Sequence, residues 1–434
     1  MSCKTLFSLL SIFPVILAAT GNGGKSTEGV DPRSYRDIVG RDDAAVHSKA
    51  QLRAGYINLD PTGAPSAESA AIGGHMHLYS RRYMGIMAGV EGYFVKDLGS
   101  SLRDNPDFFD NDGDSFALLS QAYLDGKWGK TSLRIGRQSL DTPHADSDDI
   151  RMMPNYFSAA LLTNRDIEGL TLRLAQIDRM AGWENTIDSS HFVPVEDILG
   201  ATKDTKPRTY PEHDRVEDIL GATKDTKGIT MLSAVYESES GFTLQGWFYR
   251  IYDIADLGYF EFGYETMISD IALTIGLQYD RAVDCQSSLT GTVDSSTFGV
   301  SVEAAVGDTG LSLLAAYNRE FGSTGAYGSL GGGPFFTSLE DQTIDAIGAK
   351  GYAWVTGVGY DLSAMGVKGV QAGLIYGRFK ADTPGLYDSA ETDIVIEYKS
   401  KGHIDTTIAY SSVEDKLTGR GSHEQIRILI NYSF

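Results

Sequence analysis

The chain has 434 residues, a formal net charge of −21, and 49 glycines, 23 tyrosines and 18 phenylalanines beside 12 prolines. The acidic balance argues against nucleic acid as a partner, because such binding needs clustered Lys and Arg that replace counterions along the phosphates. The glycines and aromatic residues favour a β-sheet protein with many close turns, and no apolar stretch beyond the N-terminal region reaches the about 20 residues that a membrane-spanning helix needs.

The N-terminal residues predict an export signal. Lys4 supplies a positive charge, residues 6–17 form an apolar run, and Ala18 and Ala19 offer the small side chains that cleavage requires. We expect residues 1–19 to be a signal peptide and residues 20–48 to be a periplasmic N-terminal segment. The exported chain would keep Cys285 alone, so the sequence predicts neither a disulfide framework nor a Cys/His metal site.

Residues 49–434 show apolar and polar residues in alternation, as a strand with lipid on one side and water on the other requires. The clearest runs are residues 271–279, 297–304, 311–318 and 424–434. In the last run Ile426, Ile428, Ile430, Tyr432 and Phe434 share one face. Weaker alternation occurs around Leu52, Met76, Val90, Leu124, Leu133, Leu161, Leu172, Leu232, Leu244, Phe260, Trp354, Leu374, Ile396 and Ile408. Together these runs predict about eighteen strands, an even number of the kind found in bacterial single-chain barrels.

The connections between these strands alternate between short and long. Short ones are expected near Ser80, Gly129, Glu168, Ser240, Ser269, Asp308, Met365 and Lys401, and long ones around Asp110, Ala145, Thr202, Ser288, Gly331, Pro384 and Asp415, with residues 252–255 as a short exception. A soluble β-sandwich would explain the alternation but not this order of connections. We therefore predict an all-β protein, a single transmembrane antiparallel β-barrel with short periplasmic turns and long extracellular loops.

Aromatic residues lie where the predicted strands end, which favours two girdles at the lipid headgroups. They include Tyr56, Tyr79, Tyr93, Trp128, Tyr236, Tyr279, Tyr317, Tyr360, Tyr376, Tyr398, Tyr410 and Tyr432.

The segment VEDILGATKDTK occurs at residues 195–206 and again at residues 216–227. Two polar copies cannot build a repeat core, so we interpret them as a duplication in an exposed loop.

The sequence predicts no enzyme. It lacks GxSxG, HExxH and phosphate-binding glycine motifs, and we expect no catalytic residue, no cofactor and no metal. His75 and His77 alternate onto the wet face of their strand, which leaves a barrel hydrolase open as a minor alternative. Residues 110–114 carry three aspartates and form a solvated turn in our interpretation, with surface calcium as the alternative.

The same alternation sorts charged residues to the inner face, because an Arg or Lys facing lipid at mid-depth costs about 2 to 4 kcal/mol. It places Arg53, Arg134, Arg173, Arg427, Glu91, Glu303, Asp393, Glu397 and Asp405 inside the predicted barrel. Arg53 lies in the first strand and Arg427 in the last, which must be neighbours in a closed barrel. A basic track of this kind can pass carboxylates from site to site, although simple solvation of the lumen is an equally good interpretation.

Residues 133–160, LRIGRQSLDTPHADSDDIRMMPNYFSAA, resemble the OprD-type outer-membrane porins, which carry a GRQ, then a TP, then a D-x-R-x-x-PN-x-F pattern. The resemblance implies an eighteen-stranded barrel whose loop near residues 139–156 folds inward as a constriction, together with a second inward loop at residues 319–350. It also implies a basic ladder for carboxylates. By position Arg137 and Arg151 would lie near the constriction, and Asp146, Asp148 and Asp149 would form its acidic side. Alternation alone places Arg134, not Arg137, inside.

From these observations we expect a porin of the bacterial outer membrane for passive, substrate-selective diffusion of small polar solutes, above all carboxylate-bearing ones such as amino acids and organic acids. The expected partners are outer-membrane lipid, lipopolysaccharide and small solutes, with the protein as a monomer or homotrimer. The alternative is a barrel that serves as a surface-exposed structural or adhesive protein.

Overall fold

The computed structural model describes residues 45–99, 106–200, 227–285, 288–400, 402–419 and 421–434. The predicted signal peptide and all but the end of the predicted N-terminal segment lie outside these ranges.

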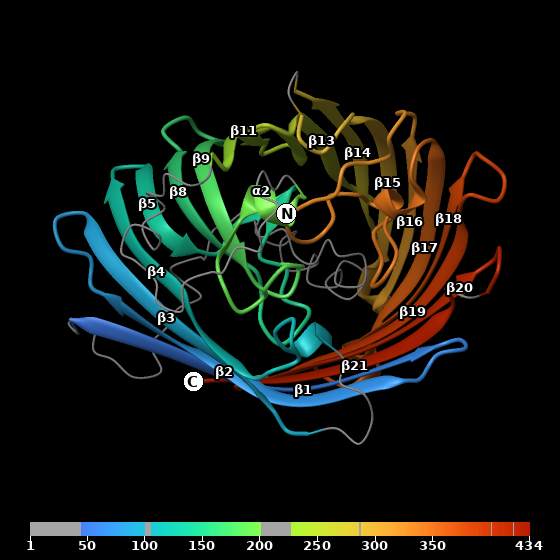
Figure 1. The fold of residues 1–434 in the computed structure, drawn as a ribbon, viewed down its shortest axis with the longest axis horizontal. Coiled ribbons are helices and arrows are strands. Elements are labelled where there is room, and N and C mark those ends of the chain that lie inside the picture. The colour runs from blue at the N-terminus through green and yellow to red at the C-terminus, as the bar shows by residue number, and fades with distance from the viewer. Residues whose placement is uncertain (1–44, 100–105, 201–226, 286–287, 401, 420) are drawn as a thin grey trace.

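Eighteen long strands form the wall of the molecule (Figure 1). Within the described ranges the main sheet has 19 strands, and one of them, the two-residue β10, pairs only with β9, which leaves 18. The long strands are β1 Val46–Pro61, β2 Ala67–Ser80, β3 Ile86–Asp97, β4 Phe116–Trp128, β5 Thr131–Gln138, β8 Tyr156–Asn164, β9 Leu170–Ala181, β11 Ile229–Glu237, β12 Phe242–Ile251, β13 Ala255–Ile268, β14 Ile271–Asp284, β15 Asp294–Val306, β16 Leu311–Glu320, β17 Gly351–Asp361, β18 Val370–Ala381, β19 Asp388–Lys399, β20 Ile404–Asp415 and β21 His423–Ser433. Each of the predicted strand positions falls in one of them, so the predicted strand set is confirmed.

The sheet closes on itself. Each long strand pairs antiparallel with the next along the chain, and β1 also pairs with the last strand, β21. In that seam Arg53 lies opposite Asn431, and Ile57 lies opposite Arg427. Closure satisfies the backbone of both terminal strands and leaves no free sheet edge. The predicted closed antiparallel barrel is therefore confirmed.

The two faces of the sheet are the reverse of those in a soluble protein. In β14, Leu277 and Tyr279 are 39% and 42% exposed, while their neighbours Gln278 and Asp280 are 1% and 0% exposed. Around the ring, large apolar side chains are exposed on the outside, whereas the buried inner face combines polar side chains with apolar clusters. An apolar outer face of this kind is stable only against hydrocarbon, so the wall is built to stand in a membrane.

Short and long connections separate to opposite ends of the barrel. One end has the turns 81–85, 129–130, 165–169, 238–241, 269–270, 307–310, 362–369 and 400–403, and the other has the connections 62–66, 98–115, 139–155, 182–228, 252–254, 285–293, 321–350, 382–387 and 416–422. The predicted short exception at residues 252–255 is confirmed. The connections predicted to be long around Pro384 and Asp415 are in fact no longer than the turn 362–369, because β18 and β19 continue pairing up to Lys380 and Asp388.

The helical pieces are small and lie in the connections. They are η3 Pro106–Phe108, α2 Val195–Ile198, η4 Gly307–Thr309, η5 Ile344–Ile347 and η6 Leu362–Met365, and the two-residue strands β6 Asp141–Thr142 and β7 Ala145–Asp146 form a hairpin within the connection 139–155. None of the helices in the described ranges has the length and apolar character of a membrane span.

The start of the duplicated segment is packed against the barrel. Val195 and Asp197 in α2 are 0% and 6% exposed, and the Glu196 carboxylate accepts the backbone N–H groups of Lys227 and Gly228. For these residues the prediction of an exposed loop is wrong, because Val195 joins an apolar cluster formed by the inner wall. Residues 201–226, which hold the rest of both copies apart from Lys227, lie outside the described ranges.

Candidate functional site

The connection 139–155, here called the first inner loop, crosses the interior of the barrel. It leaves β5, and the Arg53 guanidinium of β1 donates to its Asp149. On the far side of the ring, His144 of the loop contacts Asp280 of β14, with Nε2 and Oδ2 2.7 Å apart. A segment that contacts both β1 and β14 of a closed sheet must pass through its interior.

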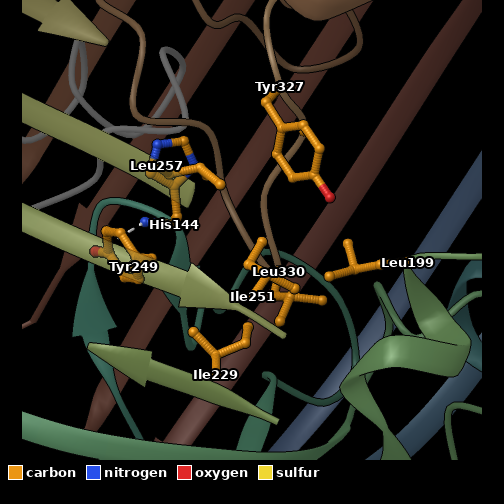
Figure 2. Close-up of a pocket in the computed structure, with 9 residues that line it drawn as sticks. His144, Leu199, Ile229, Tyr249, Ile251, Leu257, Tyr327 and Leu330 are labelled. Carbon is orange, nitrogen blue, oxygen red and sulfur yellow. Dashed lines mark hydrogen bonds between the residues drawn. The ribbon is translucent and has the colours of Figure 1, made fainter. Parts of the chain in front are cut away.

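His144 anchors this loop to the wall. Its imidazole is 3% exposed and the Asp280 carboxylate is 0% exposed. Figure 2 shows His144 beside Tyr249 of β12, whose hydroxyl lies 3.4 Å from the His144 backbone nitrogen, and close to Leu330. The His144 ring also lies edge-on to the rings of Tyr249 and Tyr259, so moving the loop here would expose a buried polar contact.

The connection 321–350, here called the second inner loop, also crosses the interior, and in Figure 1 it lies within the ring of strands. The Phe336 N–H donates to the Gln278 side chain of β14 at 3.1 Å, and the Asp341 N–H donates to Glu391 of β19 at 2.9 Å. Its Glu340 forms an ion pair with Arg427 of β21, with 2.7 Å between Nη2 and Oε2.

The two inner loops are bonded to each other. The Asp146 N–H donates to the Leu330 carbonyl at 3.1 Å, and the Leu330 N–H donates to the His144 carbonyl at 3.0 Å. Glu184, from the connection 182–228, accepts the Gly332 N–H at 3.0 Å and an Asn155 N–H at 2.6 Å. Three connections from the long-loop end are thus tied into one inner structure.

Arg53 lies at the seam of the barrel and faces this structure. Its Nη1 and Nη2 donate to the two Asp149 carboxylate oxygens at 2.5 and 2.8 Å, Nη1 also donates to the Arg151 carbonyl, and Nε donates to Asn431 at 2.7 Å. Arg53 is 2% exposed, whereas the side chain of Asp149 is 50% exposed. The fork-shaped pairing fixes the first inner loop to β1.

Arg151 and Arg427 lie in the same region. The Arg151 guanidinium stands over the Trp183 ring, 4.7 Å from its centre, and its Nε is 3.5 Å from Asp107. Both arginines interact electrostatically with Asp148. The Nε and Nη1 atoms of Arg427 are buried and have no hydrogen-bond acceptor among the described residues. The predicted residues Arg53, Arg151, Arg427, Asp148 and Asp149 are therefore brought together.

Burial raises the pKa values of two aspartates in the first inner loop. It raises the pKa of Asp146 to about 7, with repulsion from Asp141 and Asp148 adding to the effect. It also raises the pKa of Asp148 to about 7, against the opposing influence of Arg151 and Arg427. Both carboxyls consequently change charge near neutral pH.

Arg134 and Arg137 both face the interior, although strict alternation puts residues three apart on opposite faces. Arg134 pairs with Asp125 at 3.0 Å and stands over the Tyr123 ring. Arg137 is 0% exposed, donates to the Leu119 carbonyl and stands 4.0 Å from the Phe192 ring centre.

The alternation is broken at Gly136. This residue has φ of +120°, and a Cβ there would lie 2.1 Å from the Ala122 carbonyl oxygen. Only glycine fits such a position, and the local change of direction turns Arg137 inward. The expectation that alternation alone places Arg134 and not Arg137 inside is therefore corrected.

Arg173 interacts electrostatically with Asp141 of the first inner loop. It projects from β9 toward β12, where its guanidinium lies 5.4 Å from the Trp247 ring centre.

The predicted acids of the inner wall include Glu91, Asp393 and Glu397, which are 4%, 0% and 8% exposed. His77 contacts the Tyr123 hydroxyl at 3.2 Å. In the ranges that the structure describes, no three His, Cys, Asp or Glu side chains form a group suited to a metal.

Sequence reasoning missed Glu340, Trp183 and Glu184. Glu340 is the partner of Arg427, and Trp183 is the ring under Arg151. They belong to connections without periodic pattern, so nothing in the alternation points to them. The one available signal was the predicted inward course of residues 319–350, which contain Glu340.

An eighteen-stranded closed barrel with a lipid-facing outer wall, a polar interior and loops folded into its opening defines a porin. Comparison with known proteins agrees: the sequence model of the family described as outer membrane porin, OprD family, matches residues 109–434. The chain belongs to the OprD family. Its members are substrate-specific, non-enzymatic channels of the bacterial outer membrane.

Solved structures show the same fold. OccK9 (OpdG) of Pseudomonas aeruginosa matches with a TM-score of 0.74 at 20% identity, and OpdK of the same organism, in a structure with vanillate, matches with 0.71 at 17%. A BenF-like porin from Pseudomonas fluorescens Pf-5 matches with 0.74 at 16%. Each comparison covers 90% of this chain and 98% of the other. No curated protein matches by sequence.

Proposed function

We propose that this porin favours small solutes that carry a carboxylate, such as amino acids and organic acids. The observation that carries the proposal is Arg427. Its buried Nε and Nη1 atoms lack an acceptor in the described part of the chain, and the guanidinium faces the inner structure beside Asp148 and Arg151. Each of these N–H donors can bind one oxygen of an anion, which makes a solute carboxylate a suitable partner for either of them.

The neighbouring arginines supply the next steps of the path. Arg53 and Arg151 are 2% and 3% exposed, so a solute reaches them by replacing a carboxylate that already pairs with them. Asp149 is the exposed member of its pair, which makes it the group that is exchanged. Passage would thus proceed by exchange of carboxylates on fixed guanidinium groups, with residues 139–156 as the constriction.

Similar structures give this proposal some support. The structure of OpdK contains vanillate, an aromatic carboxylate. For the present chain we further propose lipopolysaccharide as a neighbour in the membrane, and a monomer or homotrimer as the assembly. The alternative function, a surface-exposed structural or adhesive barrel, has no requirement for guanidinium donors without an acceptor in the interior.

The test compares glutamate and glutamine, which have nearly the same size and differ in charge. Liposomes containing the protein should swell faster in glutamate, and Arg427→Gln should reduce this preference about tenfold, the equivalent of about 1.4 kcal/mol for one charged hydrogen-bond pair. Arg378→Gln, which removes an arginine from the outer face, serves as the matched control and should keep the preference.

Two results would overturn the proposal. Equal swelling in both solutes with the wild-type protein would disprove the carboxylate preference but would still be consistent with a channel. A reconstituted protein without unitary conductance steps would favour the structural or adhesive barrel.

A further inference from the structure

Four outward-facing arginines follow an aromatic residue by two positions on alternate strands of the wall. A spacing of two keeps both side chains on the outer face and puts the arginine one step nearer the long-loop end. The pairs are Phe248 and Arg250 in β12, Tyr279 and Arg281 in β14, Tyr317 and Arg319 in β16, and Tyr376 and Arg378 in β18. Aromatic rings favour the membrane interface, so these guanidinium groups stand at the height of lipid phosphates in the outer leaflet.

Each of these arginines pairs with an aspartate near the same end of the wall. Arg250 pairs with Asp256, Arg281 with Asp294, Arg319 with Asp382 and Arg378 with Asp388. The row is therefore close to neutral, and it offers a lipid headgroup only those guanidinium N–H donors that the aspartates leave free.

A hollow lies on the outer face beneath part of this row of arginines. Gly246 of β12 and Gly258 of β13 have no atom within 4 Å of the position a Cβ would take, so the wall lacks side chains there. The hollow measures about 520 Å³ and is lined chiefly by apolar groups, with Leu232, Phe248 and Phe260 as its walls.

Arg281 closes the upper end of this hollow. It lies directly opposite Gly258 in the pairing of β13 with β14 and is among the lining residues. Its Nη1 donates to Asp294 at 2.7 Å and to the Ser295 carbonyl at 2.6 Å. Within the described ranges, Nε and Nη2 have no protein acceptor, which leaves N–H donors for a phosphate oxygen.

We propose that this hollow is a binding site for one phosphorylated lipid of the outer leaflet. One acyl chain would lie over Gly246 and Gly258 between Leu232 and Phe260, and a phosphate would bind Arg281. The free N–H donors of Arg281 and the apolar walls together favour this occupant: a free phosphate gains nothing from the apolar walls, and an apolar surface alone gains nothing from the donors. The site is on the outer wall and is independent of the proposed carboxylate path.

The test measures binding of lipid A that carries its phosphates to the detergent-solubilised full-length protein, by native mass spectrometry. We expect one tightly held lipid. Gly258→Leu fills the hollow and should abolish this binding, and Arg281→Gln should weaken it about tenfold, as should enzymatic removal of the lipid phosphates. Gly92→Leu is the matched control, because Gly92 is an exposed strand glycine in β3 with equally open space around it, outside the hollow.

Wild-type conductance in each variant shows that the barrel is folded and separates this test from that of the proposed function. Binding to Gly258→Leu at the wild-type level would overturn the proposal. Displacement of the lipid by inorganic phosphate would show a simple anion site instead. Loss of an oligomer in Gly258→Leu, without loss of lipid, would identify the hollow as a contact between copies.

Discussion

Arg53 on the inner face of β1 and Arg250 on the outer face of β12 each form a two-pronged pair with an aspartate, yet their surroundings are opposite. Arg53 is 2% exposed and its partner Asp149 belongs to a loop far along the chain. The side chain of Arg250 is 53% exposed and its partner Asp256 is the residue opposite it in the neighbouring strand. The same Arg–Asp pairing therefore fixes a loop inside the barrel, whereas on the outside it joins two neighbouring strands and fixes no loop.

The largest expected effect comes from removing the inner partner. Asp149→Ala leaves the Arg53 guanidinium buried without its counter-charge, and we expect the free energy of unfolding to fall by about 3 kcal/mol. Denaturant unfolding in lipid vesicles, followed by tryptophan fluorescence, measures this change. Asp112→Ala, which removes an exposed aspartate from the connection 98–115, should leave the free energy of unfolding unchanged. A loss below about 1 kcal/mol for Asp149→Ala would mean that lumen water already solvates Arg53.

The second anchor of the first inner loop should have a smaller effect. Asp280→Asn keeps the size of the side chain but removes the charge that faces His144, so we expect a loss of about 2 kcal/mol, in the range of one hydrogen bond to a charged group. The loop should also become open to proteases added on the long-loop side. Asp405→Asn, at an exposed position in β20, is the control. Unchanged protease resistance would show that Arg53 alone holds the loop.

These anchors also mark the limit of what the sequence predicts. The alternation of Leu277, Gln278 and Tyr279 follows from the physics of a wall between lipid and water, so strand number, closure and the seam between Arg53 and Arg427 could be predicted. A pattern of period two contains no information on pairing between a strand and a distant loop. The contacts of Glu340 and Trp183 therefore had to come from the structure.

Strand β5 shows a second limit of prediction from the sequence, which concerns the direction of a side chain within a strand. Its single irregular residue, Gly136, reverses the inward and outward sense of everything that follows it in the strand. A glycine within a strand indicates a bulge as one option among several, and the sequence does not state which way Arg137 turns.

A milder effect is expected when pH changes the charge of the inner site. Asp146 and Asp148 have pKa values of about 7, so both lose their negative charge as the pH falls from 8 to 6. The inner site becomes more positive, and the preference for glutamate over glutamine should rise about threefold, since the solute carboxylate stays ionised in this range. Liposome swelling in glutamate and in glutamine at each pH measures the preference. Asp148→Asn should show a raised preference at pH 8 and a smaller pH response, and a preference that falls on acidification would contradict the assignment.

The smallest effect should come from the outer pair. Arg250→Gln removes one member of an exposed ion pair, and the remaining Asp256 stays in contact with water and needs no counter-charge. We expect the same denaturation midpoint as the wild type in vesicles, and no change in the preference for glutamate, because the side chain is separated from the lumen by the wall of the barrel. Raising the salt concentration should leave this result unaltered, whereas a destabilisation comparable to that of Asp149→Ala would show that the outer pair is desolvated in the membrane and that the two faces hold their arginines by the same means.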